Sequence, residues 1–423
     1  MMERYSEYKD SGVKWLGEIP SHWEVVPIKH SYKFTVGWTP PTGRNDLFEG
    51  NNLWANISDL GDKVIRTTTN HISDSAVRQS GRSISPKGSL LYSFKLSVGT
   101  VSFCGADMYT NEAIATFLKG KNSLEFLYYA APIFIIKNAN TNIYGAPILN
   151  QDLIKNALVL LPPLSEQDAI VRYLDSATSE IDKAIAMQQK MIGLLNERKQ
   201  IIIQNAVTKG LDENVEMKES GVEWIGKIPK HWEVRRGKFL FRVVNEYSTT
   251  GQEELLTVSD RTGITPRSMK NVNMFMSEYL IGYKKCQKGD ICSNIMWMWH
   301  GAVGVTEYNG VISPSYGVYR QIAVNYDNKY LDYMLRLPRL VEVYGICSTG
   351  LTESRLRLYP DDFMNIQFFI PPVEEQKSIV LQIQKQITDI EKSIRNAENL
   401  ITLLQERKQI IINEVVTGKV RVS

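Results

Sequence analysis

The chain has 423 residues, 43% of them hydrophobic and 22% charged, which is typical of an ordinary globular protein with two or three domains. Its formal net charge of +3 is too small to indicate a nucleic-acid binder, so any basic surface must come from local clustering. The four cysteines lack the spacing of a zinc site or a disulfide framework, and no segment is apolar enough for a signal peptide or a membrane span. These features predict a cytoplasmic protein that binds no metal and no membrane.

An internal duplication organises the chain. Three segments return with a constant offset of 209 residues (Ser11 to Ser220), which indicates two copies of one unit with a head, a body and a tail. The repeated segments are SGVKWLGEIPSHWEV at Ser11 and SGVEWIGKIPKHWEV at Ser220, PPLSEQ at Pro162 and PPVEEQ at Pro371, and LLNERKQIII at Leu194 and LLQERKQIII at Leu403.

The first head, residues 11–25, places Trp15 and Trp23 around an Ile19-Pro20 step, which favours an extended chain over a helix. The body that follows, to about residue 160, alternates turn clusters such as TPPTGRN with short apolar runs such as SLLYSF, a pattern typical of short strands. A helical patch at residues 123–136 interrupts this pattern, and Pro132 should end or kink the helix. The body is therefore predicted to mix α and β structure.

After Pro162-Pro163 the hydrophobic period becomes that of a long coiled-coil helix. Ser165 is expected to cap its first turn and Gly210 to mark its end. Roughly 44 residues at about 1.5 Å each give a rod of about 65 Å, which needs a partner along its length. The rows expected to face that partner are Ile170, Ala177, Ala184 and Met191 with Leu174, Ile181, Leu195 and Ile202 in the first helix, Ile383, Ile390, Leu404 and Ile411 in the second helix, and Leu194 and Leu403 in the same seam.

The second unit repeats this plan, so the partner of the first helix is expected in the same chain. The first helix must run from the first body to the second and the second helix must run back, which makes the pair antiparallel. The predicted fold class is α+β, with two similar mixed α/β domains joined by two long antiparallel coiled-coil helices in an internal pseudo-twofold repeat. The predicted boundaries are 1–160 for the first domain with its head at 11–25, 161–210 for the first helix, 211–369 for the second domain with its head at 220–234, and 370–423 for the second helix.

The two bodies share a scaffold but differ in the side chains that it carries. The paired positions are Lys87 with Lys288, Val98-Gly99 with Val303-Gly304, and Tyr92, Phe94 and Lys95 with the cluster of Asn294, Trp297 and Trp299. One framework is thus expected to present two different surfaces.

Motifs of the common catalytic sites are missing: the sequence has no GxxxxGK[ST] phosphate loop, no GxGxxG, no HExxH and no GxSxG elbow. His22 and His231 are repeat equivalents, and we interpret them as packing or hydrogen-bonding residues of the heads. The ERK triplets at Glu197 and Glu406 are interpreted as solvated charges with salt bridges inside the helix pair, although their identity also suggests a shared contact with a partner. No catalytic residue is predicted.

Two related but non-identical bodies at a fixed separation suit a long, regular ligand that is read at two places, and duplex DNA fits that description. Recognition of DNA needs cations for phosphates and forked or amide side chains for base edges. The candidate DNA-contacting residues are Arg44, Lys95, Asn140 and Asn142 in the first body and Arg261, Arg267, Asn294, Trp297, Trp299, His300, Arg355 and Arg357 in the second. For each of them an ordinary surface role is the alternative.

The heads, the PPLSEQ and PPVEEQ helix starts, the repeated decapeptides and the KGDI and SPSYGVY stretches at Lys288 and Ser313 together resemble the specificity subunits of type I restriction-modification systems, over essentially the whole chain. The resemblance implies two target recognition domains that each read one half of a split, asymmetric DNA sequence, with the helices setting the number of unread base pairs between the halves. It also implies two modification subunits, which bind S-adenosylmethionine and methylate adenine, and restriction subunits that use ATP and Mg. This chain would bind none of these cofactors itself.

Two other functions stay open on the sequence alone. One is a non-catalytic coiled-coil scaffold that joins two protein partners without nucleic acid. The other is a self-sufficient restriction-modification polypeptide, against which the missing methyl-donor and nuclease motifs argue. Sequence-selective DNA binding that weakens steeply with salt would distinguish a DNA-reading subunit from the scaffold, and methylation by the chain alone would indicate the enzyme.

Overall fold

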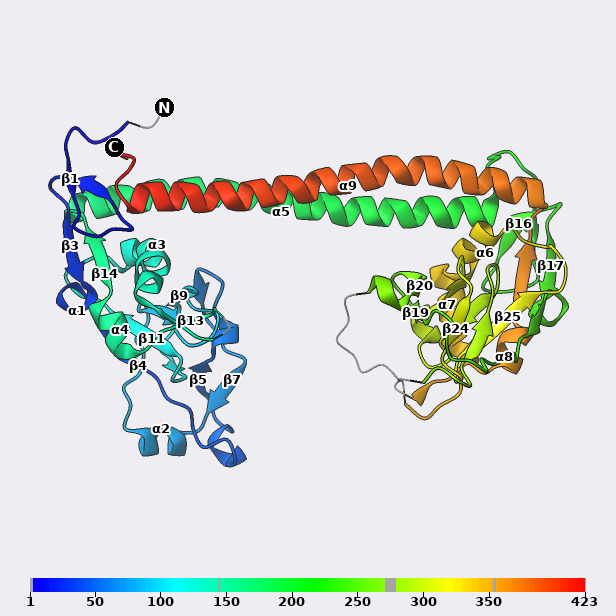
Figure 1. Ribbon diagram of the computed structural model, residues 1–423, viewed down its shortest axis with the longest axis horizontal. Helices are drawn as coiled ribbons and strands as arrows, with labels where there is room; N and C mark the ends of the chain where they lie inside the picture. The colour runs from blue at the N-terminus through cyan, green and yellow to red at the C-terminus, as the bar shows by residue number, and fades with distance from the viewer. Residues whose placement is uncertain (1–2, 144, 271–278, 353–354, 423) are drawn as a thin grey trace. The chain divides into compact units, whose positions relative to one another are not determined.

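A computed structural model of the protein describes residues 3–143, 145–270, 279–352 and 355–422. The chain forms two compact units, Met1–Gln188 with Asn399–Ser423 (unit 1) and Gln189–Glu398 (unit 2). Each unit contains one mixed body and one part of each long helix, α5 (Leu164–Lys209) and α9 (Val373–Val416), as Figure 1 shows. The predicted fold class is confirmed. The predicted domain boundaries remain a prediction.

The elements of each body are short, as the frequent turn signals of the sequence predict. Before α5 the chain forms β1 (Tyr8–Asp10), β2 (Glu18–Pro20), β3 (Glu24–Pro27), α1 (Ile28–Ser31), β4 (Lys33–Val36), β5 (Asn52–Ala55), β6 (Val64–Ile65), β7 (Asn70–Ile72), α2 (Asp74–Ser80), β8 (Leu90–Ser93), β9 (Val101–Cys104), β10 (Tyr109–Thr110), β11 (Ile114–Leu118), α3 (Leu124–Phe134), β12 (Asn140–Thr141), β13 (Pro147–Ile148), α4 (Gln151–Asn156) and β14 (Leu158–Leu161). Between α5 and α9 it forms β15 (Met217–Glu219), β16 (Lys227–Pro229), β17 (Glu233–Arg236), β18 (Phe241–Val243), β19 (Leu256–Ser259), β20 (Gly263–Pro266), β21 (Lys284–Cys286), β22 (Ile291–Ser293), β23 (Val303–Val305), β24 (Gly310–Ile312), β25 (Gly317–Gln321), α6 (Asn328–Leu335), α7 (Pro338–Cys347), α8 (Pro360–Asn365) and β26 (Gln367–Ile370).

Both bodies are built on the same antiparallel sheet. Its strand order is β4-β11-β8-β9 in unit 1, where β6 adds a parallel edge strand, and β18-β25-β22-β23 in unit 2. In both bodies, strand pairs made by the head segment and the end of the body, β3 with β14 and β17 with β26, lead into the long helices. The two copies of the repeated unit therefore share the same strand order and connections.

The strand register corrects one detail of the predicted alignment. Val303 pairs with Ser293 in β22, and the residue in the same place in unit 1 is Val101, which pairs with Tyr92 in β8. Val303-Gly304 therefore does not match Val98-Gly99, which lies in the loop before β9. The connections between the two strands differ in length, and a Val-Gly pair occurs at a different place in each body. The sequence alone therefore suggested the wrong alignment.

A shared turn leads into this hairpin in both bodies. The backbone N–H of Lys87 donates to Asp107 Oδ1 (2.7 Å), and that of Lys288 donates to Asn309 Oδ1 (2.9 Å). The next residues, Gly88 and Gly289, have φ values of +85° and +94°, which glycine adopts without strain. The KG dipeptide of both copies is thus explained by backbone geometry.

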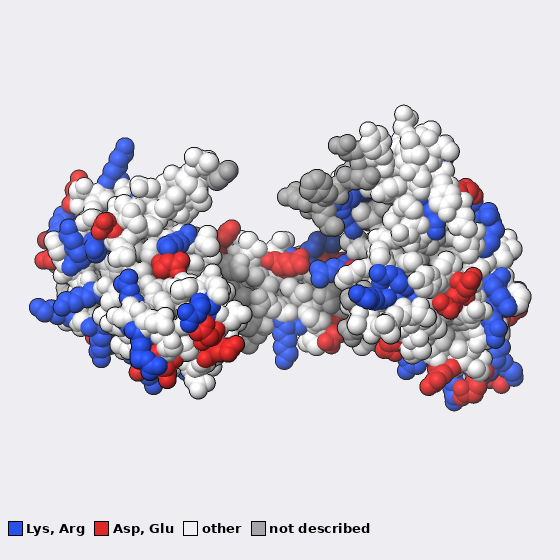
Figure 2. Space-filling model, turned by 90° about the horizontal axis from the view of Figure 1, so that it is seen from below, with Lys and Arg blue, Asp and Glu red and all other residues white. Residues whose placement is uncertain are grey.

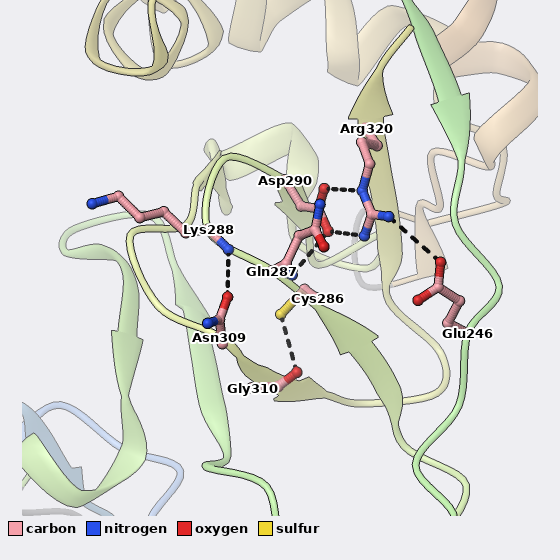
Figure 3. A network of polar contacts seen from close by, with 8 residues as sticks. All are labelled: Glu246, Cys286, Gln287, Lys288, Asp290, Asn309, Gly310 and Arg320. Carbon is pink, nitrogen blue, oxygen red and sulfur yellow. Dashed lines mark hydrogen bonds and ion pairs between the residues drawn. The ribbon is translucent and has the colours of Figure 1, made fainter.

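The two bodies diverge directly after this turn. In unit 2 the buried Asp290 accepts hydrogen bonds from Arg320 Nε (2.7 Å) and Nη2 (2.8 Å) and from the backbone N–H of Gln287 (2.9 Å), as Figure 3 shows. The Asp290 hydrogen bond raises the pKa of Arg320, and Glu246 lies 3.5 Å from Arg320 on its other side. The pair ties the turn to strand β25.

Each long helix begins in a joint with the preceding head. Glu166, in the first turn of α5, accepts hydrogen bonds from Trp23 Nε1 (2.9 Å) and lies 2.6 Å from His22 Nε2. In unit 2, Glu375 in the first turn of α9 is in the same way 3.1 Å from Trp232 Nε1 and 2.7 Å from His231 Nε2. The predicted role of the two histidines as hydrogen-bonding head residues is confirmed, and their partner is the glutamate of the PPLSEQ and PPVEEQ segments.

The glutamine of the same segments joins each helix to its own body. Gln167 is fully buried, donates to Pro162 O (2.8 Å) and accepts from the N–H of Ser123, the N-cap residue of α3 (3.1 Å). Gln376 is also fully buried; it donates to Pro371 O and Asn325 O and accepts from the N–H of Asp327, the N-cap residue of α6. These contacts fix the start of each helix against the body that it follows.

The far end of each helix packs on the other copy's body, as the repeat predicts. Ile412, Val415 and Val416 of α9 belong to the hydrophobic core of the first body, together with Ile170 and Leu174 of α5. Ala206 and Val207 of α5 belong to the core of the second body, and Tyr330 donates to Val207 O (2.7 Å). This arrangement makes α5 and α9 antiparallel in each unit.

Burial along the helix pair varies among the expected seam residues. Leu174, Ile181, Ile383 and Ile390 are buried, and Leu195, Ile202, Leu404 and Ile411 are half-buried. The predictions for Leu194, Leu403 and Met191 were wrong, because these side chains are 55%, 60% and 41% exposed. A two-helix pair buries only a narrow stripe of each helix, so a second apolar row is left facing solvent.

Repeat-equivalent ion pairs cross between the helices in each unit. Lys199 lies 2.6 Å from Glu391 in unit 2, and Lys408 lies 2.7 Å from Asp182 in unit 1. The predicted salt bridges within the helix pair are therefore confirmed for the lysine of each ERK triplet. None of the described helices is both long and apolar enough to cross a membrane.

Two of three predicted helix boundaries change slightly. Helix α5 begins at Leu164, and Pro163 O accepts the first hydrogen bonds, so Ser165 is not the cap. Gly210, with φ +77°, follows its last residue as predicted. Helix α3 continues two residues past Pro132 and passes into a 3-10 turn at Ile135–Asn138, so the helix ends within one turn of the proline.

Candidate nucleic-acid interface

The connection between the two middle strands of the shared sheet differs most clearly between the bodies. In unit 1 it spans residues 94–100, and its Lys95 side chain is exposed, 3.4 Å from Glu112. A hydrogen bond from Thr39 and the nearby Lys95 ammonium lower the pKa of Glu112. Tyr92 and Phe94, which the sequence placed on the same surface, are buried in the core. Lys95, Leu96 and Ser97 are the exposed residues at the tip, and Leu96 is 72% exposed.

The equivalent connection of unit 2, residues 294–302, carries an aromatic cluster (Trp297, Trp299 and His300). Trp297 stacks on Trp299 with ring centroids 6.2 Å apart and on His300 with centroids 5.2 Å apart. Trp299 and His300 lie 3.9 Å apart and are tilted by 37°. The structure therefore brings together three of the residues that the sequence singled out, and Trp297 remains 54% exposed.

Asn294 holds this loop from inside, although the sequence suggested a surface reader. Its side chain is only 7% exposed, donates to Tyr316 Oη (2.9 Å) and accepts from the backbone N–H of Met296 (3.1 Å). The amide is used within the protein, so Asn294 is corrected to a positioning residue for the aromatic cluster.

Arg355 and Arg357 lie beside the same loop. The segment that contains them is tied to it by a hydrogen bond from Leu358 N–H to Ile295 O (3.0 Å) and forms a β-bridge between Thr349 and Arg357. Arg355 is exposed, whereas Arg357 is half-buried and donates to Leu356 O (2.8 Å). The aromatic cluster and the two arginines thus lie on neighbouring segments of the second body.

The remaining candidates of unit 2 lie on a hairpin. Arg261 is exposed in the turn between β19 and β20, and Arg267 is half-buried directly after β20. Arg336 from α6 donates to Asp260 O (2.6 Å) and Arg261 O (3.0 Å) and so holds this turn.

In unit 1 the candidates lie on separate loops. Arg44 is exposed and forms two hydrogen bonds with Asp46 (2.7 and 2.6 Å), which lower the pKa of Asp46. Asn140 is exposed in the hairpin of β12 and β13, where Asn142 Oδ1 accepts from the N–H of Ala146 (2.8 Å). The arginine is neutralised by its neighbour, and the hairpin exposes Asn140 together with the apolar Ile143 and Ile148.

Figure 2 shows Lys and Arg side chains interspersed with Asp and Glu on the drawn face of each body. Among the described residues no group of three or more His, Cys, Asp or Glu side chains could hold a metal ion.

Sequence reasoning missed a second kind of surface, the exposed apolar face of each repeated decapeptide. On α5 it consists of Met191, Leu194 and Ile201, with the exposed Arg198 between them. Helical spacing places these residues on one face. The residues in the same places on α9 are Leu400, Leu403, Arg407 and Ile410, of which the three apolar ones are 41%, 60% and 55% exposed. We call these two faces the decapeptide stripes.

Comparison with known proteins agrees on one family. Residues 20–188 match the model of the type I restriction modification DNA specificity domain. The MjaVIII specificity subunit of a type I restriction enzyme from Methanocaldococcus jannaschii is 23% identical over 98% of this chain and 97% of its own length. The EcoBI specificity subunit from Escherichia coli is 24% identical over 74% of this chain and 71% of its own length.

Solved structures show the same fold. A chain from a type I restriction-modification system superposes with a TM-score of 0.67 at 15% identity, covering 94% of this chain and 98% of that one. The HsdS subunit from Thermoanaerobacter tengcongensis gives a TM-score of 0.50 at 16% identity and covers 95% of this chain and 98% of its own.

Proposed function

Because this chain belongs to the family of type I restriction-modification specificity subunits, which recognise DNA and do not catalyse, we propose that each of its bodies reads one half of a bipartite, asymmetric DNA site. The observation that carries the proposal is the shared hairpin, β8–β9 in one body and β22–β23 in the other, whose connections differ in length and side chains. A common frame with different loops suits two readers of different sequences, since loops decide which groups meet base edges.

In this proposal the helices set the number of unread base pairs between the halves. The glutamate and glutamine joints hold each helix start rigidly, so a change in helix length would be transmitted to the bodies. Adding one turn to both α5 and α9 is expected to lengthen the spacer and to leave both half-sites unchanged. Altered half-site bases would contradict the separation of reading from spacing.

The test of the reading itself is to map methylated adenines in a host that carries the complete system. We expect a split motif. Replacing residues 294–302 with a connection from a relative of different sequence should change one half only, and the same exchange of residues 94–100 should change the other half. A change in both halves by one exchange, or methylation without sequence preference, would sink the proposal.

Modification subunits are proposed to dock on the decapeptide stripes. Two stripes with equivalent apolar residues and an arginine at the same place offer the same surface twice, which fits two copies of one partner. Leu194→Glu with Leu403→Glu should abolish co-purification with the modification subunit. The matched control, Gln200→Glu with Gln409→Glu, adds the same charge beside the stripes and should leave binding intact.

Cofactors are proposed to lie outside this chain. S-adenosylmethionine would be bound by the modification subunits, and ATP and Mg by the restriction subunits. Methylation by the isolated chain would contradict this assignment. The scaffold alternative predicts complexes whose affinity for DNA is negligible and insensitive to salt, whereas the DNA-reading proposal requires affinity that falls steeply with salt.

A further inference from the structure

The aromatic cluster of unit 2 is a preformed platform of three rings, of which Trp297 and His300 are exposed and Trp299 is half-buried. Trp297, at 54% exposure, stacks on both other rings, which lie closer to each other than to it. The ring of Trp299 is oriented by a hydrogen bond from its Nε1 to Met296 O (3.0 Å). A π face of this kind, held in place before binding, loses little conformational freedom when another flat ring stacks on it.

The loop below the cluster is anchored on several sides. Met298 is fully buried in the hydrophobic core of the second body, between the two tryptophans in sequence. The left-handed turn at Gly301 (φ +88°) lies against α7, where an added Cβ would meet Val341 at 3.2 Å. With the bonds of Asn294 and Ile295 described above, these contacts make the exposure of Trp297 a fixed feature of the loop.

The first body has no such platform in the equivalent connection. There the exposed tip consists of Lys95, the aliphatic Leu96 and Ser97, and its two aromatic neighbours, Tyr92 and Phe94, are buried in the core. The core of a shared scaffold therefore does not require the exposed tryptophan. A surface function specific to the second body accounts for it.

The surroundings of Trp297 favour a nucleic acid over a protein as the occupant. The loop residues 294–301, NIMWMWHG, include no acidic side chain, and the exposed Arg355 lies on the segment tied to Ile295. Exposed aromatic rings next to cations are the usual means by which proteins hold an unstacked base beside its phosphates.

Building on the proposed function, we propose that Trp297 stacks on one base within the half-site read by the second body, at a step where the duplex is opened or unstacked. Trp299 and His300 would support the ring from behind, and Arg355 would contact the adjacent backbone phosphate. Recognition by the second body would then combine deformation of the DNA with contacts to base edges, whereas the first body would rely on its polar loops.

The test is a coupling experiment with the complex of this chain and its modification subunit. Duplexes carry the site mapped by methylation, and each base of both half-sites is replaced in turn by an abasic analogue. Trp297→Ala should weaken binding of the intact site about tenfold or more. At one position in the second half-site, the effects of the abasic replacement and of Trp297→Ala on the binding free energy should be strongly non-additive. The fluorescence of 2-aminopurine placed at that position should be quenched in the unmodified complex and not in the Trp297→Ala variant.

Two further variants keep the result interpretable. Trp297→Phe retains a π face and should keep most of the affinity, and Leu96→Ala in the equivalent loop should show no coupling in that half-site. Additive effects of Trp297→Ala at every position would overturn the stacking proposal while leaving sequence-selective binding intact. Loss of association with the modification subunit in Trp297→Ala would overturn it too, because it would identify a protein contact. Absence of sequence-selective binding by the unmodified complex would instead contradict the proposed function.

Discussion

The two bodies use one strand order but hold the same hairpin in different ways. In unit 1 the outer edge of β9 is completed by backbone, because Phe103 N–H donates to Lys63 O (2.8 Å) beside β6. In unit 2 the equivalent N–H, of Val305, donates to a side chain, Asp332 Oδ1 on α6 (2.9 Å). The backbone pattern is common to both copies, whereas the groups that satisfy it are not.

A second difference lies at the entry to the hairpin. The buried Asp290 and the half-buried Arg320 form an ion pair in unit 2, and the strand register places Ser89 and Leu118 at these positions in unit 1. The two bodies therefore reach the same topology with different interior chemistry. The stabilities of the two bodies should therefore depend differently on substitutions and on pH, in addition to the differences between their loops.

The largest expected effect comes from breaking this ion pair. Asp290→Ala removes a buried carboxylate and leaves the half-buried Arg320 without its main partner, which should destabilise the second body by about 3 kcal/mol or more. Hydrogen exchange in urea, which reports each body separately, measures the change in β22 and β25. Ser89→Ala, at the equivalent position of the first body, should change stability by less than about 1 kcal/mol.

The residues of the first body, Ser89 and Leu118, can be copied into the second body. Asp290→Ser with Arg320→Leu removes both charges together and should regain most of the loss, because no buried charge is left unpaired. A double variant as unstable as Asp290→Ala would show that the two interiors are not interchangeable.

The glutamine joints should show a smaller and graded difference. Gln376 makes three hydrogen bonds and Gln167 makes two. Replacement by leucine keeps the volume but leaves buried backbone groups unsatisfied, at about 1 kcal/mol each. We expect Gln376→Leu to cost about 3 kcal/mol and Gln167→Leu about 2 kcal/mol in urea unfolding. Equal costs would mean that the count of hydrogen bonds does not govern the joints.

The stability of the two bodies should depend differently on pH at the hairpin edges formed by β9 and β23. Burial, opposed by the hydrogen bond from Val305, raises the pKa of Asp332 above its ordinary value. A carboxyl group whose pKa is raised by folding stabilises most below its unfolded pKa, and this contribution is lost as pH rises through the folded pKa. The second body should therefore gain stability from Asp332→Asn increasingly as pH rises from 3 to 7, whereas the first body should not change. A constant difference across this range would contradict the shift.

Much of the architecture follows from the sequence, because the repeat offset and the heptad period constrain it directly. The constant offset predicts two equivalent bodies, and Pro162-Pro163 and Gly210 bound α5 to within two residues. The period alone does not say which of two apolar rows faces the partner helix. Leu194 was assigned to the seam for this reason, although it is exposed.

The candidate site follows from the sequence only in part. The unusual WMWH string predicts an aromatic cluster, and the structure assembles one. The inward turn of Asn294 depends on Tyr316, which is distant in sequence, so residue type alone could not reveal it. For the same reason Glu166 and Gln167 were interpreted only as the start of a helix, since their partners come from the head and from the N-terminus of α3.

The smallest expected effect concerns the feature in which the units agree best. Lys199–Glu391 and Lys408–Asp182 occupy repeat-equivalent places, with partly exposed side chains in both pairs. Double-mutant cycles with alanine should give coupling energies of about 0.2–1 kcal/mol in each unit, since exposed ion pairs are weakened by solvent. Both couplings should shrink together when salt is raised to about 1 M. A coupling that survives salt in one unit only would mean that the symmetric part of the molecule, like the bodies, has diverged.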